Sequence, residues 1–234
     1  MQFKIGNSSK QAAQLCSVEE NSKEWQTLIV GPIPTTRIKE AGQPVIVIVH
    51  HFSNACVPFE DTSFFYEDRN FKGKSHECSG DNADLHTYFA HCNSILVENG
   101  CWVIYERSNY MGHQYYLKSG EYPDYQSWLG LNDSIRSCHS IPNHHGSYRI
   151  RLYEREDFRG QMKEYVNDCS NIYESFHTNN ILSCSVLDGY WIFFEEPGFK
   201  GNQYFLKPGE YRRYASWGST NSKVGSLKKI ADFH

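Results

Sequence analysis

The chain has 234 residues, and its 23 lysines and arginines against 27 aspartates and glutamates give a formal net charge of −4 at pH 7. A nucleic-acid-binding protein needs a basic face, and a membrane span needs about 18–20 consecutive apolar residues, so the sequence predicts neither a nucleic-acid partner nor a membrane partner. The chain begins without the apolar core of a signal peptide, and its eight cysteines form no C-x-x-C pair. We therefore expect a cytoplasmic protein with reduced thiols and without a zinc or thioredoxin-like site.

Residues 1–61 stand apart in composition, because they hold only 4 of the 35 aromatic residues. Glycine and proline at 31–34 and 42–44 interrupt regular structure, whereas the β-branched run 45–49 has strand propensity. This part of the chain contains no copy of the repeat that follows. We expect an irregular or disordered extension that the rest of the fold does not require.

From residue 62 onward, one pattern occurs four times. Each copy has an aromatic residue followed by glutamate, a second aromatic residue five positions after the first, and a glycine at position eight. The copies begin at Tyr66, Tyr105, Tyr153 and Phe194, and they end at Gly73, Gly112, Gly160 and Gly201. A serine in a β-like segment follows each copy: Ser94, Ser134, Ser183 and Ser226.

The pattern is typical of a hairpin that folds back on itself. Glycine permits positive φ, an aromatic ring can shield the folded-back segment, and a serine hydroxyl can satisfy an unpaired backbone group. Residues 148–153 alternate apolar and basic side chains, and this alternation favours a strand. A unit of about 40 residues has room for four short strands, so two units make a β-sandwich.

The repeat is hierarchical. Copies two and four share the block Gln-Tyr-(Tyr/Phe)-Leu-Lys-x-Gly-Glu-Tyr at 114–122 and 203–211, and a tryptophan follows each block after six residues. The chain is therefore a duplicated pair of motifs in the order A, B, A′, B′. Tryptophans at repeat-equivalent positions are expected in the cores of the domains: Trp102, Trp128, Trp191 and Trp217.

These motifs resemble the vertebrate γ-crystallins of the βγ-crystallin family, from about Thr62 to His234. The resemblance includes Cys-Trp-Val-Ile-Tyr-Glu-Arg at 101–107, Gly-Glu-Tyr-Pro-Asp-Tyr-Gln-Ser-Trp at 120–128, Tyr-Glu-Arg-Glu-Asp-Phe-Arg-Gly-Gln-Met at 153–162 and Gly-Glu-Tyr-Arg-Arg-Tyr at 209–214. It implies an all-β fold of two Greek-key β-sandwich domains, each built from two βγ-crystallin motifs. The irregular extension, which is not part of the resemblance, precedes the first domain.

The resemblance also implies domain boundaries and a domain interface. The N-terminal domain is expected at 62–142 with motifs 62–101 and 102–142, the linker at 143–146, and the C-terminal domain at 147–234 with motifs 147–189 and 190–234. Six residues are expected to meet between the domains in repeat-equivalent pairs: Val103 with Ile192, Tyr116 with Phe205, and Ile141 with Ile230. Tyr116 departs from the usual phenylalanine, so its hydroxyl is expected to reach water.

Residues with ligand or catalytic chemistry have structural explanations in this sequence. The four windows that bind calcium in microbial relatives, 89–94, 129–134, 178–183 and 221–226, lack the full set of oxygen-bearing residues. The histidine pairs 50–51 and 144–145 are interpreted as solvated loop residues. No nucleophile elbow, phosphate loop or metalloprotease motif is present, so we expect no catalytic residue, no metal and no cofactor.

The function that the resemblance implies is that of a structural constituent of the eye lens. Such a protein supplies refractive index and transparency in the cytoplasm of lens fibre cells, is mostly monomeric, and makes weak contacts with itself and with other crystallins. Two alternatives belong to other classes: a calcium-binding or stress-protective βγ-crystallin module outside the lens, and an enzyme or carbohydrate-binding β-sandwich. The incomplete calcium windows disfavour the first, and the repetition of every candidate residue disfavours the second.

Overall fold

A computed structural model describes residues 14–18, 26–30 and 61–231 of the chain, which divides into two units, Met1–Ala55 and Cys56–His234. In the first unit, β1 (Gln14–Val18) and β2 (Gln26–Val30) pair antiparallel, with Gln14 opposite Val30. The sequence interpretation, an irregular or disordered extension, included no strand at these ten residues. Thr27, Ile29 and Val30 are β-branched, which suits β2 to a pleated strand. The run 45–49 and the histidines at 50–51 lie outside the described residues.

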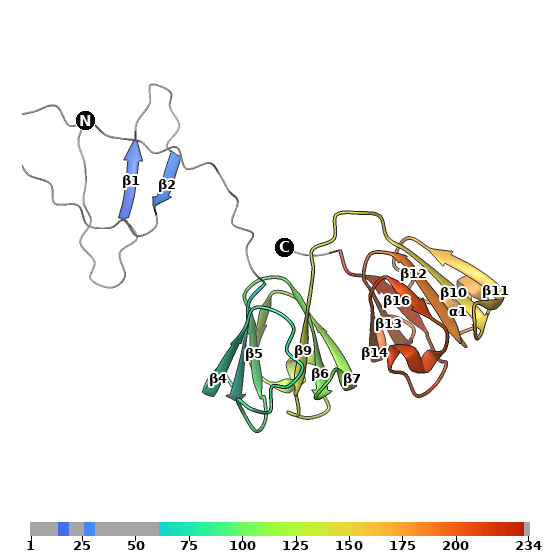
Figure 1. The fold of residues 1–234 in the computed structure, drawn as a ribbon, viewed down its shortest axis with the longest axis horizontal. Helices are drawn as coiled ribbons and strands as arrows, with labels where there is room; N and C mark the ends of the chain where they lie inside the picture. Colours follow the sequence, from blue (N-terminus) through green and yellow to red (C-terminus); the bar gives the residue numbers. More distant parts are fainter. Residues whose placement is uncertain (1–13, 19–25, 31–60, 232–234) are drawn as a thin grey trace, which may run out of the picture. The chain divides into compact units, whose positions relative to one another are not determined.

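The second unit holds both repeated pairs of motifs. The strands of the N-terminal domain are β3 (Ser63–Asp68), β4 (Lys72–Cys78), β5 (Ser94–Val97), β6 (Cys101–Arg107), β7 (Met111–Leu117), β8 (Gly120–Tyr122) and β9 (Ser137–Ile141). Those of the C-terminal domain are β10 (Arg149–Arg155), β11 (Arg159–Tyr165), β12 (Ser183–Asp188), β13 (Trp191–Glu196), β14 (Lys200–Leu206), β15 (Gly209–Tyr211) and β16 (Ser226–Lys229). The prediction of an all-β fold is confirmed, with one short α-helix, α1 (Ile172–Phe176), and two 3₁₀ helices among the described residues (Figure 1).

Each domain exchanges strands between its two motifs. The sheet order β4-β3-β5-β8 places β8 of motif B beside the strands of motif A, and β11-β10-β12-β15 repeats this arrangement in the C-terminal domain. In return, residue 82 of motif A forms an isolated bridge with Cys138 in β9, and Cys169 forms the equivalent bridge with Leu227 in β16. This exchange ties the two motifs of a domain into one Greek-key sandwich.

Among residues 61–231, the buried apolar side chains gather in three clusters. One cluster fills the N-terminal domain around Phe65 and Trp102, and a second fills the C-terminal domain around Phe193 and Trp191. The third lies between β6, β7 and β9 of one domain and β13 and β14 of the other. The six-stranded sheet β16-β13-β14-β7-β6-β9 joins the domains where Gln114 of β7 pairs with Gln203 of β14.

Candidate functional site

The four repeated hairpins share one hydrogen-bond geometry. In the first copy, Ser94 Oγ donates to Asp68 O at 2.6 Å and accepts from Phe71 N at 2.9 Å. Ser183 and Ser226 make the same two bonds in copies three and four, at 2.5–3.0 Å. Each serine hydroxyl therefore satisfies two backbone groups of the turn.

The second aromatic residue of each hairpin has a left-handed backbone, with φ between 59° and 62°. Its ring meets the first aromatic ring edge to face, with centroids 5.6–5.8 Å apart in all four copies. The motif glycines also have positive φ, from 77° at Gly73 to 84° at Gly112. A left-handed aromatic residue is strained, so the serine bonds and the ring contact are what stabilise this conformation.

In the second copy, the structure assigns the hairpin serine differently from the sequence. Ser137 Oγ donates to Arg107 O at 2.7 Å and accepts from Tyr110 N at 3.0 Å, whereas Ser134 Oγ donates to Glu106 O at 3.3 Å. The prediction of Ser134 was therefore wrong. Motifs B and B′ each contain a 3₁₀ helix, Tyr125–Trp128 and Tyr214–Trp217, which lengthens the segment between glycine and serine. The serine follows the glycine by 25 residues in both, and this shared spacing was the signal for Ser137.

The four tryptophans lie in the cores of the two domains, as two equivalent pairs. Trp102 and Trp191 are fully buried, and their Nε1 atoms donate to Asn99 O and Asp188 O, both at 3.1 Å. Trp128 and Trp217 are also buried, but within residues 61–231 their Nε1 atoms have no hydrogen-bond partner. The two tryptophans of each pair therefore share one environment. The pairs differ in whether the indole N–H donates a hydrogen bond within the described residues.

The six residues expected between the domains lie in one apolar cluster. Val103, Ile141, Ile192 and Ile230 are almost fully buried there, and Tyr116 and Phe205 pack against them. The hydroxyl of Tyr116 was expected to reach water. In the structure it lies 3.2 Å from Cys101 Sγ, so it has a partner within the protein. Cys101, Tyr105 and Phe194 complete the buried part of the cluster.

Two glutamines join the domains beside this cluster, and the sequence interpretation missed them. Gln114 Oε1 accepts a hydrogen bond from Phe205 N at 2.8 Å, and Gln203 Oε1 accepts one from Tyr116 N at 3.0 Å. Gln114 Nε2 also donates to Trp217 O at 3.3 Å. The signal was present in the repeat, because each glutamine is the first residue of the block shared by motifs B and B′.

The linker histidine His144 is packed, which corrects its interpretation as a solvated loop residue. Its Nε2 lies 2.7 Å from Ser147 O and 3.4 Å from Asp188 Oδ1, and its side chain is 19% exposed. The ring also contacts Tyr148 and Tyr190 edge to face. His145 is exposed, as the sequence interpretation has it. The linker is thus attached to the C-terminal domain through one of its two histidines.

In the sequence window 129–134, which corresponds to a calcium-binding window of microbial relatives, side-chain oxygens accept hydrogen bonds from the protein itself. Asn132 Oδ1 accepts from Ser134 N at 2.8 Å, and the Asp133 carboxylate accepts from Asn93 Nδ2 at 3.2 Å. In the part of the chain that the structure describes, no three His, Cys, Asp or Glu side chains are placed to hold a metal ion. Over the same residues, no helix has the length and apolar character of a transmembrane segment.

Comparison with known proteins identifies the family. The Beta/Gamma crystallin family matches residues 63–141 and 149–230. Gamma-crystallin M2 of Chiloscyllium indicum is 58% identical over 168 residues, which cover 72% of this chain and 96% of that protein. Gamma-crystallin B of Canis lupus familiaris is 58% identical over 170 residues, covering 73% and 97%, and Gamma-crystallin 2 of Rana temporaria is 56% identical over 167 residues, covering 71% and 99%.

The matched residues include all four hairpins, the four tryptophans and the cluster between the domains. The relatives are matched over almost their whole length, so the similarity extends across both domains together. This chain belongs to the βγ-crystallin family and, within it, to the vertebrate γ-crystallins.

Proposed function

We propose that this protein is a structural constituent of the eye lens, where it supplies refractive index without scattering light. The observation that carries the proposal is its identity of 56–58% to γ-crystallins across both domains. γ-Crystallins are structural lens proteins and not enzymes, and the repeated residues of this chain serve the fold in each copy.

The aromatic composition supports an optical role. Phenylalanine, tyrosine and tryptophan make up 15% of the chain, and their electrons are highly polarisable. The hairpin geometry uses these rings as structural parts, since each of the four copies stacks one ring edge against another. A high refractive increment per unit mass is therefore compatible with a stable fold.

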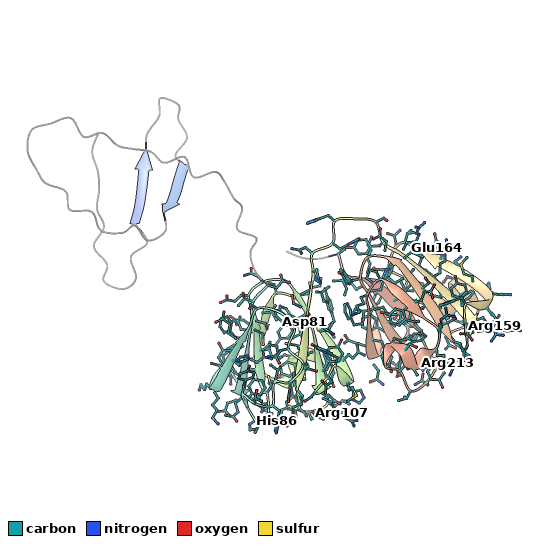
Figure 2. The ribbon with its side chains drawn as sticks, in the orientation of Figure 1. Asp81, His86, Arg107, Arg159, Glu164 and Arg213 are labelled. Atoms are coloured by element: carbon teal, nitrogen blue, oxygen red, sulfur yellow. The ribbon has the colours of Figure 1, made fainter. Side chains whose placement is uncertain are left out.

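The surface supports close packing at high concentration. Oppositely charged side chains are interspersed on the C-terminal domain, as in the pairs Arg151–Glu164 at 2.7 Å and Arg213–Glu156 at 3.6 Å. Figure 2 shows Arg159, Glu164 and Arg213 on the outside of this domain. Mixed charges with a small net charge of −4 allow neighbouring molecules to approach closely.

The domain pairing supports a monomer. The apolar cluster between the domains is filled by side chains of one chain, and the edge strands β9 and β16 each make one bridge to the same domain, with residues 82 and 169. An edge strand that already makes a bridge within its own domain is less available for pairing with a second molecule. We therefore infer a monomer in the cytoplasm of lens fibre cells that contacts itself and other crystallins only weakly and at high concentration.

Optical measurements test this function. The refractive index and the light scattering of the purified protein are measured over a concentration series up to that of lens cytoplasm. We expect the refractive index to increase linearly, with scattering per molecule that falls as the concentration increases. Scattering per molecule that increases steadily would show clustering and would contradict a role in transparency.

A further inference from the structure

The connection between motifs A and B is an Asx-Gly turn in both domains. Asn99–Gly100 leads from β5 into β6, and Asp188–Gly189 leads from β12 into β13. They are the only Asn-Gly and the only Asp-Gly dipeptide in the sequence, and both end two residues before a core tryptophan, Trp102 or Trp191. The two turns are therefore structural equivalents with chemically different side chains.

The fold requires glycine at the second position of both turns. Gly100 has φ of 81° and Gly189 has φ of 73°, a backbone that other residues adopt only with strain. A Cβ atom on Gly100 would overlap the carboxylate of Asp61, and a Cβ atom on Gly189 would overlap the ring of Tyr148. The glycine cannot be exchanged in either turn.

A glycine in this position allows a spontaneous reaction, because it gives little steric hindrance to attack by its own nitrogen on the preceding side chain. At Asn-Gly, a bond forms between the glycine N and the asparagine Cγ while the Cγ–Nδ2 bond breaks. The glycine amide proton leaves with the side-chain nitrogen as ammonia. Water then opens the succinimide ring to aspartate or isoaspartate. At Asp-Gly the leaving group is water, so the carboxyl group must first be protonated.

The two turns differ in what holds the side chain. Ser147 Oγ donates to Asp188 Oδ2, Gly189 N donates to Oδ1 at 3.0 Å, and His144 Nε2 lies 3.4 Å from Oδ1. These contacts favour the carboxylate, and the hydrogen bond from Ser147 is the main reason that the pKa of Asp188 lies below its ordinary value. Among residues 61–231, the side-chain amide of Asn99 has no hydrogen bond; only its backbone is bonded, to Thr62 O and to the indole of Trp102.

We propose that Asn99 is the site at which this protein spontaneously deamidates and forms isoaspartate, and that Ser147 protects Asp188 at the equivalent turn. In isoaspartate the main chain runs through Cβ and Cγ of residue 99, so the carbonyl that accepts the Trp102 indole leaves the main chain and becomes the free carboxylate. Either product also places a new carboxylate next to Glu98 in the sequence. The carboxylate of Asp61, which lies against Gly100, is a second negative charge near this turn. Modification at this surface turn thereby reaches the core of the N-terminal domain.

Ageing of the full-length protein tests the proposal. The wild type and the variants Asn99→Gln, Ser147→Ala and Ser127→Ala are incubated for weeks at body temperature and neutral pH, after circular dichroism has shown that each is folded. Isoaspartate is then measured at each site by enzymatic methylation and peptide mass spectrometry. Ser127→Ala is the matched control, since Ser127 Oγ donates to Asp124 at 2.8 Å but a tyrosine follows that aspartate.

In the wild type, we expect isoaspartate at residue 99 to accumulate several times faster than at any other asparagine, with residue 188 unmodified. Asn99→Gln should abolish the signal at 99, and Ser147→Ala should create one at 188 that Ser127→Ala does not create. Modification of residue 99 no faster than of other asparagines would overturn the assignment of Asn99. Isoaspartate at 188 in the wild type, or none there in Ser147→Ala, would overturn the protection by Ser147.

Discussion

Gln114 and Gln203 lie opposite each other where β7 meets β14, and each side chain accepts a backbone N–H of the other domain. The two bonds are related by the internal repeat, but the surroundings of the glutamines are not equal. Gln114 is 7% exposed and also donates to Trp217 O at 3.3 Å, whereas Gln203 is half-buried. The domains are therefore joined by hydrogen bonds as well as by the apolar cluster, and the glutamine of the N-terminal domain is the more buried of the two.

This asymmetry predicts unequal effects of changing either glutamine to glutamate. Gln114→Glu removes the donor to Trp217 O and places a charge in a buried position, so it should lower the free energy of unfolding by roughly 1–3 kcal/mol. Gln203→Glu should have a smaller effect because that side chain reaches solvent. Guanidinium unfolding measures both, with exposed Gln126→Glu as the control. Equal losses for Gln114 and Gln203 would show that burial does not distinguish them.

The hairpin serine of the second motif gives a direct comparison of neighbouring residues. Ser137→Ala leaves the backbone groups of Tyr110 and Arg107 without their partner, which should cost roughly 1–3 kcal/mol of unfolding free energy. Ser134→Ala removes one long bond of 3.3 Å and should cost less than Ser137→Ala. Thermal unfolding of both variants measures the difference. A greater loss for Ser134→Ala would restore the assignment made from the sequence.

The carboxylate of Glu106 should make stability depend on pH. Burial alone would raise its pKa, but hydrogen bonds and charge attraction from His113, with a further hydrogen bond from Tyr115, hold the pKa below its ordinary value of 4.5. A depressed pKa contributes stability that is present above the unfolded value and is lost as the pH falls through the folded value. Glu106→Gln should therefore flatten the loss of unfolding free energy below about pH 5.

Urea unfolding at a series of pH values measures this effect, with exposed Glu121→Gln as the matched control. The control should keep the slope of the wild type. If Glu106→Gln also keeps that slope, the contacts with His113 and Tyr115 do not stabilise the ionised carboxylate.

One hydrogen bond shows where the N-terminal domain begins. Asp61 Oδ2 accepts from Ser140 Oγ at 2.6 Å, so Asp61 belongs to the N-terminal domain. Deleting residues 1–60 should shift the unfolding midpoint by no more than about 2–4 °C, which corresponds to roughly 1 kcal/mol in a chain of this size. Deleting 1–61 should lower the midpoint further, because Ser140 loses its acceptor. Scanning calorimetry compares the two deletions, and a large decrease already with 1–60 would place part of the extension in the fold.

The repeat made most of the fold predictable, because every copy carries the same glycine and aromatic signals and motifs B and B′ carry the same tryptophans. The residues around Ser134 and Ser137 do not distinguish them, since both serines lie near the end of motif B; only the 25-residue spacing from the motif glycine, shared with motif B′, points to Ser137. Local patterns also could not show that His144 packs, because its partner Asp188 is distant in sequence. The glutamine pair was accessible from the pseudo-symmetry but not from composition, since an isolated glutamine carries no signal of burial.

The most direct test of the lens function is the location of the protein itself. Quantitative peptide mass spectrometry, using peptides from residues 61–231, would compare dissected lens fibre cells with other tissues of the same animal. A structural lens protein should be among the abundant proteins of the fibre-cell cytoplasm and scarce elsewhere. Absence from fibre cells, with abundance in another tissue, would contradict the proposed function and favour a βγ-crystallin role outside the lens.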